Sequence, residues 1–529
     1  MHYYMALSRM SLLLRSKSKS KSKSSVSASN LFLFRILFLL FLLFLLFLIF
    51  ALSGCVTITH QIQTAVTAAK RYPSAMGPTS LSDQPPQVEL KNYQSVETSP
   101  DRPYQRSDLA VAVAVSGGGY RASDLTIGVL EGLEATHNHY LKGNLLEEVD
   151  YFSTVSGGGF AVGYYLSNLN KFLLAHEKSK LNSNSNSNSN SIPWPHYDFT
   201  AFVNQQIEQP VIKNLNTGAL SGNVLNLDQS WVVDLGADHY DAYESNINDG
   251  FLGASDFTLG QVFISAHNKI QHPKLPLWVI NATIYQNMAI LPFTPEVLKA
   301  YGVDQYRHLG SPYDRSGDSQ KFLYQFPYAV ALAASSSVPF AMHSVTLGSN
   351  ACANHAPCYL QLFDGGLSDN LGVTSAYHML LEDPAPMKLL IIIDAGRRHP
   401  SAFSQEQTPP GVFSLLWQIM NSGVEASRLL VRNNVHQFAS ALLCQNGAKN
   451  VLIAYLDLTD YPKEDAIPTS LYLTNDQEKA LIQAGQGLVK NNKILMEDLP
   501  KLLSGNRSIG ACPAILPKTA FDVGQSWRG

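Results

Sequence analysis

The chain has 529 residues, of which 45% are hydrophobic and 15% are charged, which is long enough to bury a large core in one to three domains. Its formal net charge is −3, but residues 1–54 contain seven Lys and Arg and no Asp or Glu, so the rest of the chain carries a formal charge of −10. Because phosphate binding requires clustered Lys and Arg, this acidic body argues against nucleic acid as a partner.

The N-terminus is typical of an exported chain. Basic residues precede the apolar run Ile36–Leu52, and Leu52-Ser53-Gly54-Cys55 follows, which resembles the signal of a bacterial lipoprotein. The resemblance implies that residues 1–54 are a signal peptide and that Cys55 is diacylated, which anchors the protein in the bacterial cell envelope. Val56, in place of Asp, favours the outer membrane, facing the periplasm or the surface. The alternative is an uncleaved anchor, for which the run is barely long enough.

Composition divides the remainder of the chain. Residues 55–105 are polar and Pro-rich and are predicted to be a tether. Residues 106–510 are predicted to form one α/β domain. The Asn-Ser alternation at 182–191 is a low-complexity insertion in that domain, and residues 511–529 form a C-terminal tail.

Two strand–turn–helix units open the domain. The apolar run Leu109–Val115 leads into Ser116-Gly117-Gly118-Gly119-Tyr120-Arg121 and then into a helix that extends to about Ala135. The run Val149–Val155 leads into Ser156-Gly157-Gly158-Gly159 and the helix Phe160–Leu169. Strand–helix–strand at this spacing predicts a parallel sheet. Glycines after a strand permit sharp turns and bring backbone N–H groups close to a ligand.

Further elements follow the same alternation of apolar runs and polar breaks. A capping box formed by Thr474 and Gln477 predicts the start of a late helix. The other predicted elements are the strands Leu277–Ile284, Tyr359–Phe363, Leu389–Ile393 and Val451–Leu456 and the helix Tyr328–Ala334.

The residues at these turns indicate acyl-transfer chemistry. Ser156 lies on a strand–turn–helix corner, which holds a nucleophilic hydroxyl clear of the backbone. The N–H groups of Gly117, Gly118 and Gly119 are candidates for an oxyanion hole. Asp364 ends a strand and precedes two glycines, and its carboxylate is a candidate base for the serine.

Other assignments compete with this one. A dinucleotide-binding turn is disfavoured because the sixth position of the first glycine turn is Ala122 and the next strand leads into Ser156 rather than an acid. Arg121 could hold a lipid phosphate or pair with Asp124. The other candidates for the base are the acids Asp124, Asp369 and Asp394 and the histidines His343, His378 and His399.

Four cysteines remain when Cys55 is set aside. Cys352, Cys358, Cys444 and Cys512 permit two disulfides in an exported protein. A bond between Cys352 and Cys358 would close a short loop, but three pairings are open, and four unrelated buried thiols are the alternative. Their spacing lacks a zinc-type pattern, so no metal is expected.

Taken together, four short motifs resemble the patatin-like phospholipases, including the catalytic domain of the cytosolic phospholipases. They are Ser116–Ala122, Val155–Gly158, Ala334–Phe340 and Asp364–Gly366. The resemblance implies a three-layer α/β/α fold with a mainly parallel central sheet and a Ser–Asp dyad without histidine.

Carried onto this chain, the resemblance makes Ser156 the nucleophile and Asp364 the base. Gly118 and Gly119 would supply the oxyanion N–H groups, with Gly117 completing the turn, and Arg121 would face the substrate phosphate. The chain departs from the family pattern at Ala122, where plant-type members commonly have glycine, and at Thr154, which replaces the first glycine of the serine turn.

The activity implied by the resemblance is that of a serine lipid acyl hydrolase, of phospholipase A or lysophospholipase type, with no cofactor. Its partners would be a phospholipid or lysophospholipid substrate and the membrane that holds Cys55. The alternatives are a catalytically silent lipoprotein scaffold of the same fold and a lipid acyltransferase, in which an alcohol replaces water.

Overall fold

The computed structural model describes the α/β domain and not the N-terminal segment. The described residues are 106, 108–141, 143–182, 199, 203, 257–263, 275–306, 323, 326, 328–339, 344–349, 358–397, 412–445, 450–470 and 472–505. The chain divides into two units, 1–62 and 63–529, and every described residue belongs to the second. The expected signal peptide, Cys55, the tether and the C-terminal tail lie outside the described residues, as do the side chains of the four other cysteines.

A mixed sheet of nine strands forms the centre of the domain. Its order is β5-β6-β7-β3-β2-β1-β8-β9, and β4 pairs with β3 outside this path. The strands are β1 (Leu109–Val115), β2 (Tyr151–Val155), β3 (Leu277–Ile284), β4 (Ala289–Pro292), β5 (Val303–Tyr306), β6 (Val345–Ser349), β7 (Cys358–Asp364), β8 (Met387–Asp394) and β9 (Asn450–Asp457).

The five strands β3, β2, β1, β8 and β9 are parallel to one another. Every residue of β1, β2, β3 and β8 is buried, as expected of parallel strands that are covered on both faces. The predicted strands are therefore confirmed, with small changes in their ends. For example, β2 begins at Tyr151 rather than Val149, because the Asp150 carboxylate accepts a hydrogen bond from the Val111 N–H group at 2.8 Å.

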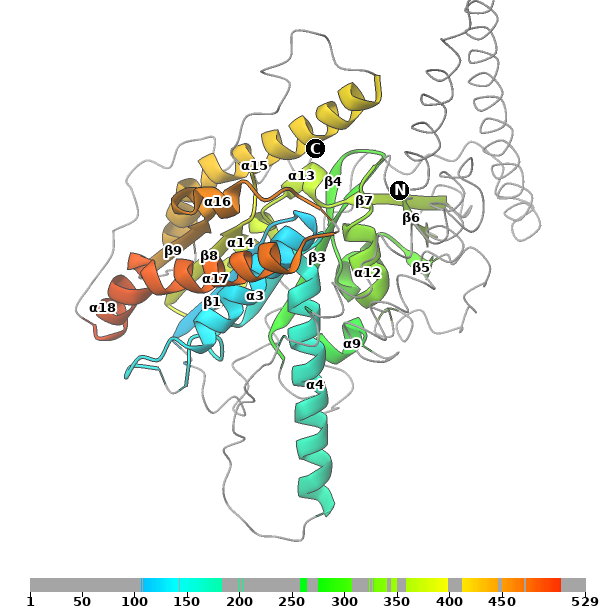
Figure 1. Ribbon diagram of the computed structural model, residues 1–529. Helices are drawn as coiled ribbons and strands as arrows, with labels where there is room; N and C mark the ends of the chain where they lie inside the picture. Colours follow the sequence, from blue (N-terminus) through cyan, green and yellow to red (C-terminus); the bar gives the residue numbers. More distant parts are fainter. Residues whose placement is uncertain are drawn as a thin grey trace, which may run out of the picture. The chain divides into compact units, whose positions relative to one another are not determined.

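Helices cover both faces of the sheet, so the expected three-layer α/β fold is confirmed. One layer contains α3 (Gly119–Glu134), α4 (Gly158–Asn182), α12 (Tyr328–Ser335) and α17 (Asn475–Asn491). The other contains α13 (Gly366–Asp369), α14 (Val373–Glu382) and α15 (Val412–Gln445). Figure 1 shows α3 and α17 lying side by side, and the capping box at Thr474 starts α17 as predicted.

The remaining elements are short and lie at the ends of the larger ones. They are α9 (Leu259–Val262), α10 (Pro295–Ala300), α16 (Pro462–Asp465), α18 (Leu499–Leu503), a 3₁₀ turn at Leu458–Asp460 and a π-helical turn at Ile494–Asp498. Within the described part of the chain, no helix has the length and apolar character needed to cross a bilayer.

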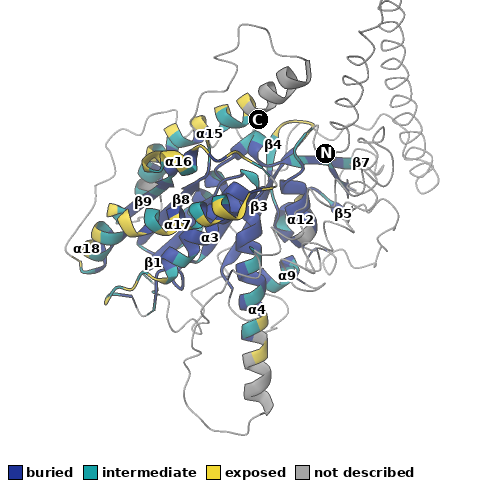
Figure 2. Cartoon of the chain, in the orientation of Figure 1, coloured by how far each residue is buried: buried dark blue, intermediate teal, exposed yellow. Residues whose placement is uncertain are grey.

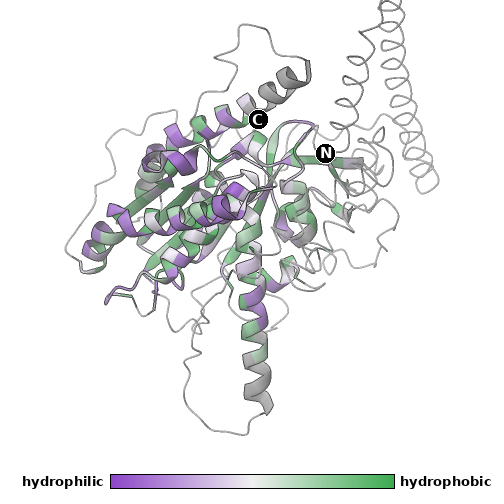
Figure 3. Cartoon of the chain, viewed as in Figure 1, coloured by the Kyte–Doolittle hydropathy of each residue, from purple (hydrophilic) through white to green (hydrophobic). Residues whose placement is uncertain are grey.

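Burial and hydropathy follow this layering. The central strands and α3 are buried, whereas α15, α17 and α18 each carry exposed residues (Figure 2). Hydrophobic residues are concentrated in the strands and hydrophilic ones lie along the outer helices (Figure 3). The core is one cluster that includes residues of all nine strands, with Leu291 as the member from β4 and Leu362 as one of those from β7.

The pairing register of β2, β3 and β7 brings the ends of β2 and β7, which are far apart in the sequence, to the same height in the sheet. Val155, the last residue of β2, pairs with Asn281 of β3. On the other side of β3, Asp364 pairs with the next residue, Ala282, and β7 runs antiparallel to β3. The end of β7 therefore lies level with the turn that follows β2, and Ser156 and Asp364 approach the same place from opposite sides of β3.

Candidate functional site

Ser156 occupies a strained turn between β2 and α4. Its φ angle is +50°, in the left-handed region that costs non-glycine residues free energy. The turn closes with the Gly159 N–H group donating to the Ser156 carbonyl oxygen at 2.9 Å. The hydroxyl thus projects from a sharp corner at the N-terminus of α4, although Thr154 replaces the usual first glycine.

The side chain of Thr154 lies beside Gly159, where a Cβ atom placed on the glycine would be 3.1 Å from the Thr154 hydroxyl oxygen. This hydroxyl accepts a hydrogen bond from the indole N–H group of Trp278 at 2.9 Å. The Thr154 hydroxyl is therefore bonded to β3, and the absence of a side chain at Gly159 leaves room for it next to the turn at Ser156.

Asp364 lies beside Ser156, and the two side chains are joined by a hydrogen bond from the Ser156 hydroxyl to the Asp364 carboxylate. The carboxylate also accepts the Gly366 N–H group at 2.8 Å. Burial raises the pKa of Asp364 to about 6, and the hydrogen bonds from Gly366 and Ser156 oppose this rise. Each residue is 7% exposed, so the pair is largely removed from water.

A short segment at the end of α12 holds both partners in place. The Ser335 hydroxyl accepts the Ser156 N–H group at 2.8 Å and donates to the Asn281 carbonyl oxygen at 2.6 Å. The backbone carbonyl of Ser337 accepts the Asp364 N–H group at 2.9 Å. The serine motif at Ala334–Phe340 therefore connects β2, β3 and β7 at the site.

The first glycine turn lies against the Ser156 turn. A Cβ atom placed on Gly117 would be 3.2 Å from the Ser156 Cβ, and one placed on Gly157 would overlap the Gly119 carbonyl oxygen. Gly118 and Gly119 have φ angles of +147° and +59°, which L side chains rarely adopt. These glycines are required by close approach and by backbone conformation.

The three N–H groups of this turn are not equivalent. The Gly117 N–H group donates to the Asn370 carbonyl oxygen at 3.0 Å, so Gly117 completes the turn and its donor is engaged. Gly118 is the N-cap of α3 and Gly119 its first residue, and among the described residues no acceptor is recorded for either N–H group. Within the described part of the chain, two unpaired donors therefore remain at the turn that packs against Ser156.

The position of the Arg121 side chain differs from the expectation that it faces a substrate phosphate. Its side chain is completely buried. Nη1 donates to the carbonyl oxygens of Asp465 and Ile467 at 2.8 and 2.5 Å, and Nη2 donates to the Asp465 carboxylate at 3.0 Å. The alternative partner, Asp124, is not the one used. The donors that would have held a phosphate are directed into the protein.

Two of the rival acids have structural partners. Asp394 is fully buried and accepts hydrogen bonds from Arg428 Nε, the Tyr455 hydroxyl and the Gly396 N–H group. Asp369 accepts the N–H groups of Leu371, Gly372 and Thr374. In both, the carboxylate oxygens are occupied by local donors.

The third rival acid, Asp124, lies on α3 and is buried together with Glu478 of α17. Burial, and then the charge of Glu478, raise the pKa of Asp124 well above its usual value. Burial also raises the pKa of Glu478 to about 7. No hydrogen-bond partner is recorded for the four carboxyl oxygens among the described residues.

Of the candidate histidines, only His378 is described. It lies on α14, stacks edge-on against Tyr377, and burial lowers its pKa to about 4. His343 and His399 lie outside the described residues. The described part of the chain contains no group of three His, Cys, Asp or Glu residues arranged to hold a metal ion.

Comparison with known proteins agrees with the motifs. A family model described as patatin-like phospholipase matches residues 113–377, about half of the chain, and this range includes Ser156, Asp364 and the glycine turns. No curated protein sequence matches the chain.

Solved structures of low sequence identity are also similar. Human GIVD cytosolic phospholipase A2 is 12% identical with a TM-score of 0.35, over 79% of this chain and 64% of that protein. This chain therefore spans less than two thirds of the human protein's length. VipD from Legionella pneumophila is 12% identical with a TM-score of 0.27, over 76% of this chain and 67% of that one.

Proposed function

This chain belongs to the patatin-like phospholipase family, and we propose that it is a lipid hydrolase, namely a serine acyl hydrolase that releases fatty acids from phospholipids or lysophospholipids. In this proposal Ser156 is the nucleophile and Asp364 the base. The observation that carries the proposal is the hydrogen bond between the Ser156 hydroxyl and the buried Asp364 carboxylate. It is supported by the N–H groups of Gly118 and Gly119, which have no acceptor among the described residues.

The proposed reaction has two steps. The Ser156 hydroxyl oxygen attacks the ester carbonyl carbon while its proton passes to Asp364, and the protonated Asp364 then gives that proton to the departing alcohol. In the second step Asp364 takes a proton from water, which attacks the acyl-serine ester. The fatty acid leaves as Ser156 recovers its proton.

The oxyanion formed in each step requires donors that are already in position. The N–H groups of Gly118 and Gly119 supply them in this proposal, assisted by the N-terminus of α4, which follows Ser156. Loss of one such donor typically costs about 3–4 kcal/mol of transition-state stabilisation, so the shape of the glycine turn matters as much as the dyad.

The decisive experiment compares Ser156→Ala with Ser440→Ala, a serine on α15 whose hydroxyl bonds to the His436 carbonyl of its own helix. Fatty acid release from phosphatidylcholine and lysophosphatidylcholine vesicles is measured for the full chain and both variants. We expect activity in the parent and in Ser440→Ala and none in Ser156→Ala. Unchanged activity in Ser156→Ala would overturn the serine mechanism, and an inactive parent would favour a silent scaffold.

Addition of a long-chain alcohol to the same assay separates hydrolysis from acyl transfer. A hydrolase releases free fatty acid in proportion to substrate consumed. A product in which the acyl chain is joined to the added alcohol would identify an acyltransferase that uses the same acyl-serine intermediate.

We further propose that Cys55 is lipidated and holds the enzyme at the bacterial envelope, where its substrates reside. The support is the sequence alone, Leu52-Ser53-Gly54-Cys55 after an apolar run. Labelled palmitate should be incorporated into the parent and not into Cys55→Ser. Equal incorporation in both proteins would contradict this proposal.

A further inference from the structure

Arg121 joins the start of α3 to a segment that lies far away in the sequence. The guanidinium group bonds to two carbonyl oxygens, of Asp465 and Ile467, and to the Asp465 carboxylate. These partners follow Arg121 by 344 and 346 residues and lie beyond the range matched by the family model. A fully buried arginine needs a partner for its charge, and here the Asp465 carboxylate supplies the opposite charge. Both Nη atoms donate hydrogen bonds, and Nε is the one guanidinium nitrogen with no hydrogen-bond partner among the described residues.

The same segment bonds directly to the glycine turn. The Ser470 carbonyl oxygen accepts the Tyr120 N–H group at 2.8 Å, and Ser470 forms a parallel bridge with Gly119. A Cβ atom on Gly119 would overlap this Ser470 carbonyl group. Residues Asp465–Ser470, which we call the C-terminal strap, therefore lie against the backbone on the C-terminal side of the two free N–H groups.

The other side of the glycine turn is held by the end of β8. The Ser116 hydroxyl accepts the Ala395 N–H group at 2.8 Å, and Arg121 Nη2 reaches the Gly396 carbonyl oxygen at 3.5 Å. Arg121 thus contacts both segments that enclose the turn. Because two consecutive glycines have little conformational preference of their own, contacts of this kind are needed to fix the direction of their N–H groups.

We propose that Arg121 is a positioning residue, which fastens the C-terminal strap against the start of α3 and so keeps the Gly118 and Gly119 N–H groups aligned beside Ser156. An oxyanion hole accelerates a reaction because its dipoles are fixed before the charge develops. The inference rests on the proposed function. It assigns Arg121 an effect on kcat, through the alignment of the glycine N–H groups, instead of a contact with the substrate phosphate.

The experiment uses two substrates that differ in phosphate. Phosphatidylcholine vesicles carry a phosphate group and p-nitrophenyl butyrate does not. For Arg121→Met we expect kcat to fall about 100-fold on both substrates, since an angstrom-scale displacement of catalytic groups has an effect of this size. KM is expected to stay within about threefold on both, because no contact with the substrate is lost.

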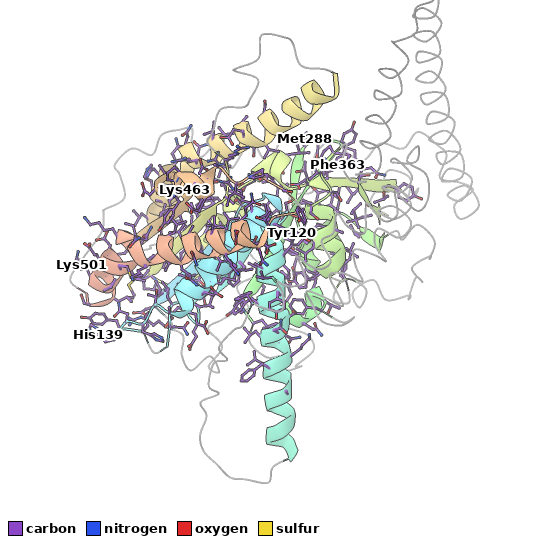
Figure 4. All side chains as sticks on the ribbon, viewed as in Figure 1. Tyr120, His139, Met288, Phe363, Lys463 and Lys501 are labelled. Carbon is purple, nitrogen blue, oxygen red and sulfur yellow. The ribbon has the colours of Figure 1, made fainter. Side chains whose placement is uncertain are left out.

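Asp465 provides a second test that leaves Arg121 unchanged. Asp465→Ala removes the carboxylate contact and leaves the two carbonyl contacts of Arg121 in place. It should therefore lower kcat about tenfold on both substrates, because the N–H groups of Gly118 and Gly119 are held less firmly. Asp465→Asn retains an oxygen that can accept from Nη2 but loses the charge, so its kcat should lie between those of Asp465→Ala and the parent. Lys463→Ala is the matched control on α16, because Lys463 is exposed (labelled in Figure 4) and should leave kcat unchanged.

The outcomes separate this inference from the proposed function. A rise in KM confined to phosphatidylcholine would show that Arg121 binds phosphate and would overturn the inference, as would an unchanged kcat in both Arg121→Met and Asp465→Ala. If Arg121→Met does not fold, as judged by its thermal transition, the pair Asp465→Ala and Asp465→Asn decides. The proposed function itself fails only if Ser156→Ala is active or the parent is inactive.

Discussion

Ser335 and Asn281 are joined by a hydrogen bond of 2.6 Å, in which the Ser335 hydroxyl donates to the Asn281 carbonyl oxygen. The hydroxyl oxygen in turn accepts the Ser156 N–H group. This arrangement leaves the end of α12 as the support of a strained residue, because φ of +50° at Ser156 persists only where the surroundings enforce it.

Substitution Ser335→Ala should therefore affect both stability and activity. The buried Ser156 N–H group and Asn281 carbonyl oxygen would each lose a partner, which we expect to cost about 1–3 kcal/mol of unfolding free energy. We expect kcat to fall at least about tenfold as Ser156 moves. Ser336→Ala is the control, because that hydroxyl donates to the Leu332 carbonyl oxygen of the preceding helix α12, and equal losses in both variants would contradict this role.

The pKa of Asp364 fixes the pH dependence that we expect of the reaction. The carboxyl group acts as a base only when ionised, and its pKa is raised to about 6 by burial. The value of kcat/KM should therefore be constant above about pH 7 and fall tenfold per unit below pH 6. A pH–rate profile measured from pH 4 to 9 tests this. An acid limb near pH 4, the pKa of His378, would point to the histidine instead.

The strain at Ser156 predicts a difference between two inactive variants. Glycine adopts positive φ without penalty, whereas alanine retains the penalty of a Cβ atom. We expect Ser156→Gly to unfold with a free energy about 1 kcal/mol higher than Ser156→Ala, measured by chemical denaturation. Equal stability of the two would show that the left-handed conformation carries no strain.

Glu478 predicts a pH-dependent change in stability. Its pKa is raised from 4.5 to about 7 in the folded chain, so the stabilisation present below the unfolded pKa is lost as pH rises through 7. Glu478→Gln should therefore match the parent near pH 4 and exceed its unfolding free energy by about 2–3 kcal/mol at pH 8.

Denaturation curves at both pH values measure this effect. Glu497→Gln is the matched control, because Glu497 is exposed and forms only a surface pair with Lys501; it should leave stability unchanged at either pH. A gain at pH 8 that is no larger for Glu478→Gln than for the control would contradict burial as the cause.

The sequence predicts the parallel part of this fold well, because its strands are buried on both faces. Leu109–Val115 is a continuous apolar run, Leu277–Ile284 is interrupted only by Asn281 and Thr283, and the structure places β1 and β3 on the same residues. The short antiparallel strands β4, β5 and β6 were not predicted. They contain as few as four residues and depend on pairing with β3 and β7 for their conformation, which a local pattern does not show.

The site was predicted in part for a similar reason. Ser156, Asp364 and the glycine turns carry local signals, namely a strand followed by glycines, and the structure brings them together. The partners of Arg121 carry none: Asp465 is one acid among many, more than 300 residues away, and the carbonyl groups of Asp465 and Ile467 belong to the backbone. The serine motif at Ala334–Phe340 was a signal for Ser335, although its contacts could not be derived from it.

The proposed reactivity of the site depends on the register in which β7 pairs with β3. Side chains alternate between the two faces of a sheet, so sliding β7 by a single position would turn the Asp364 carboxyl group away from Ser156. Such a molecule could retain most of its core and still lack a base. The register defined by the pairing of Asp364 with Ala282 would then decide whether a folded chain possesses the proposed base.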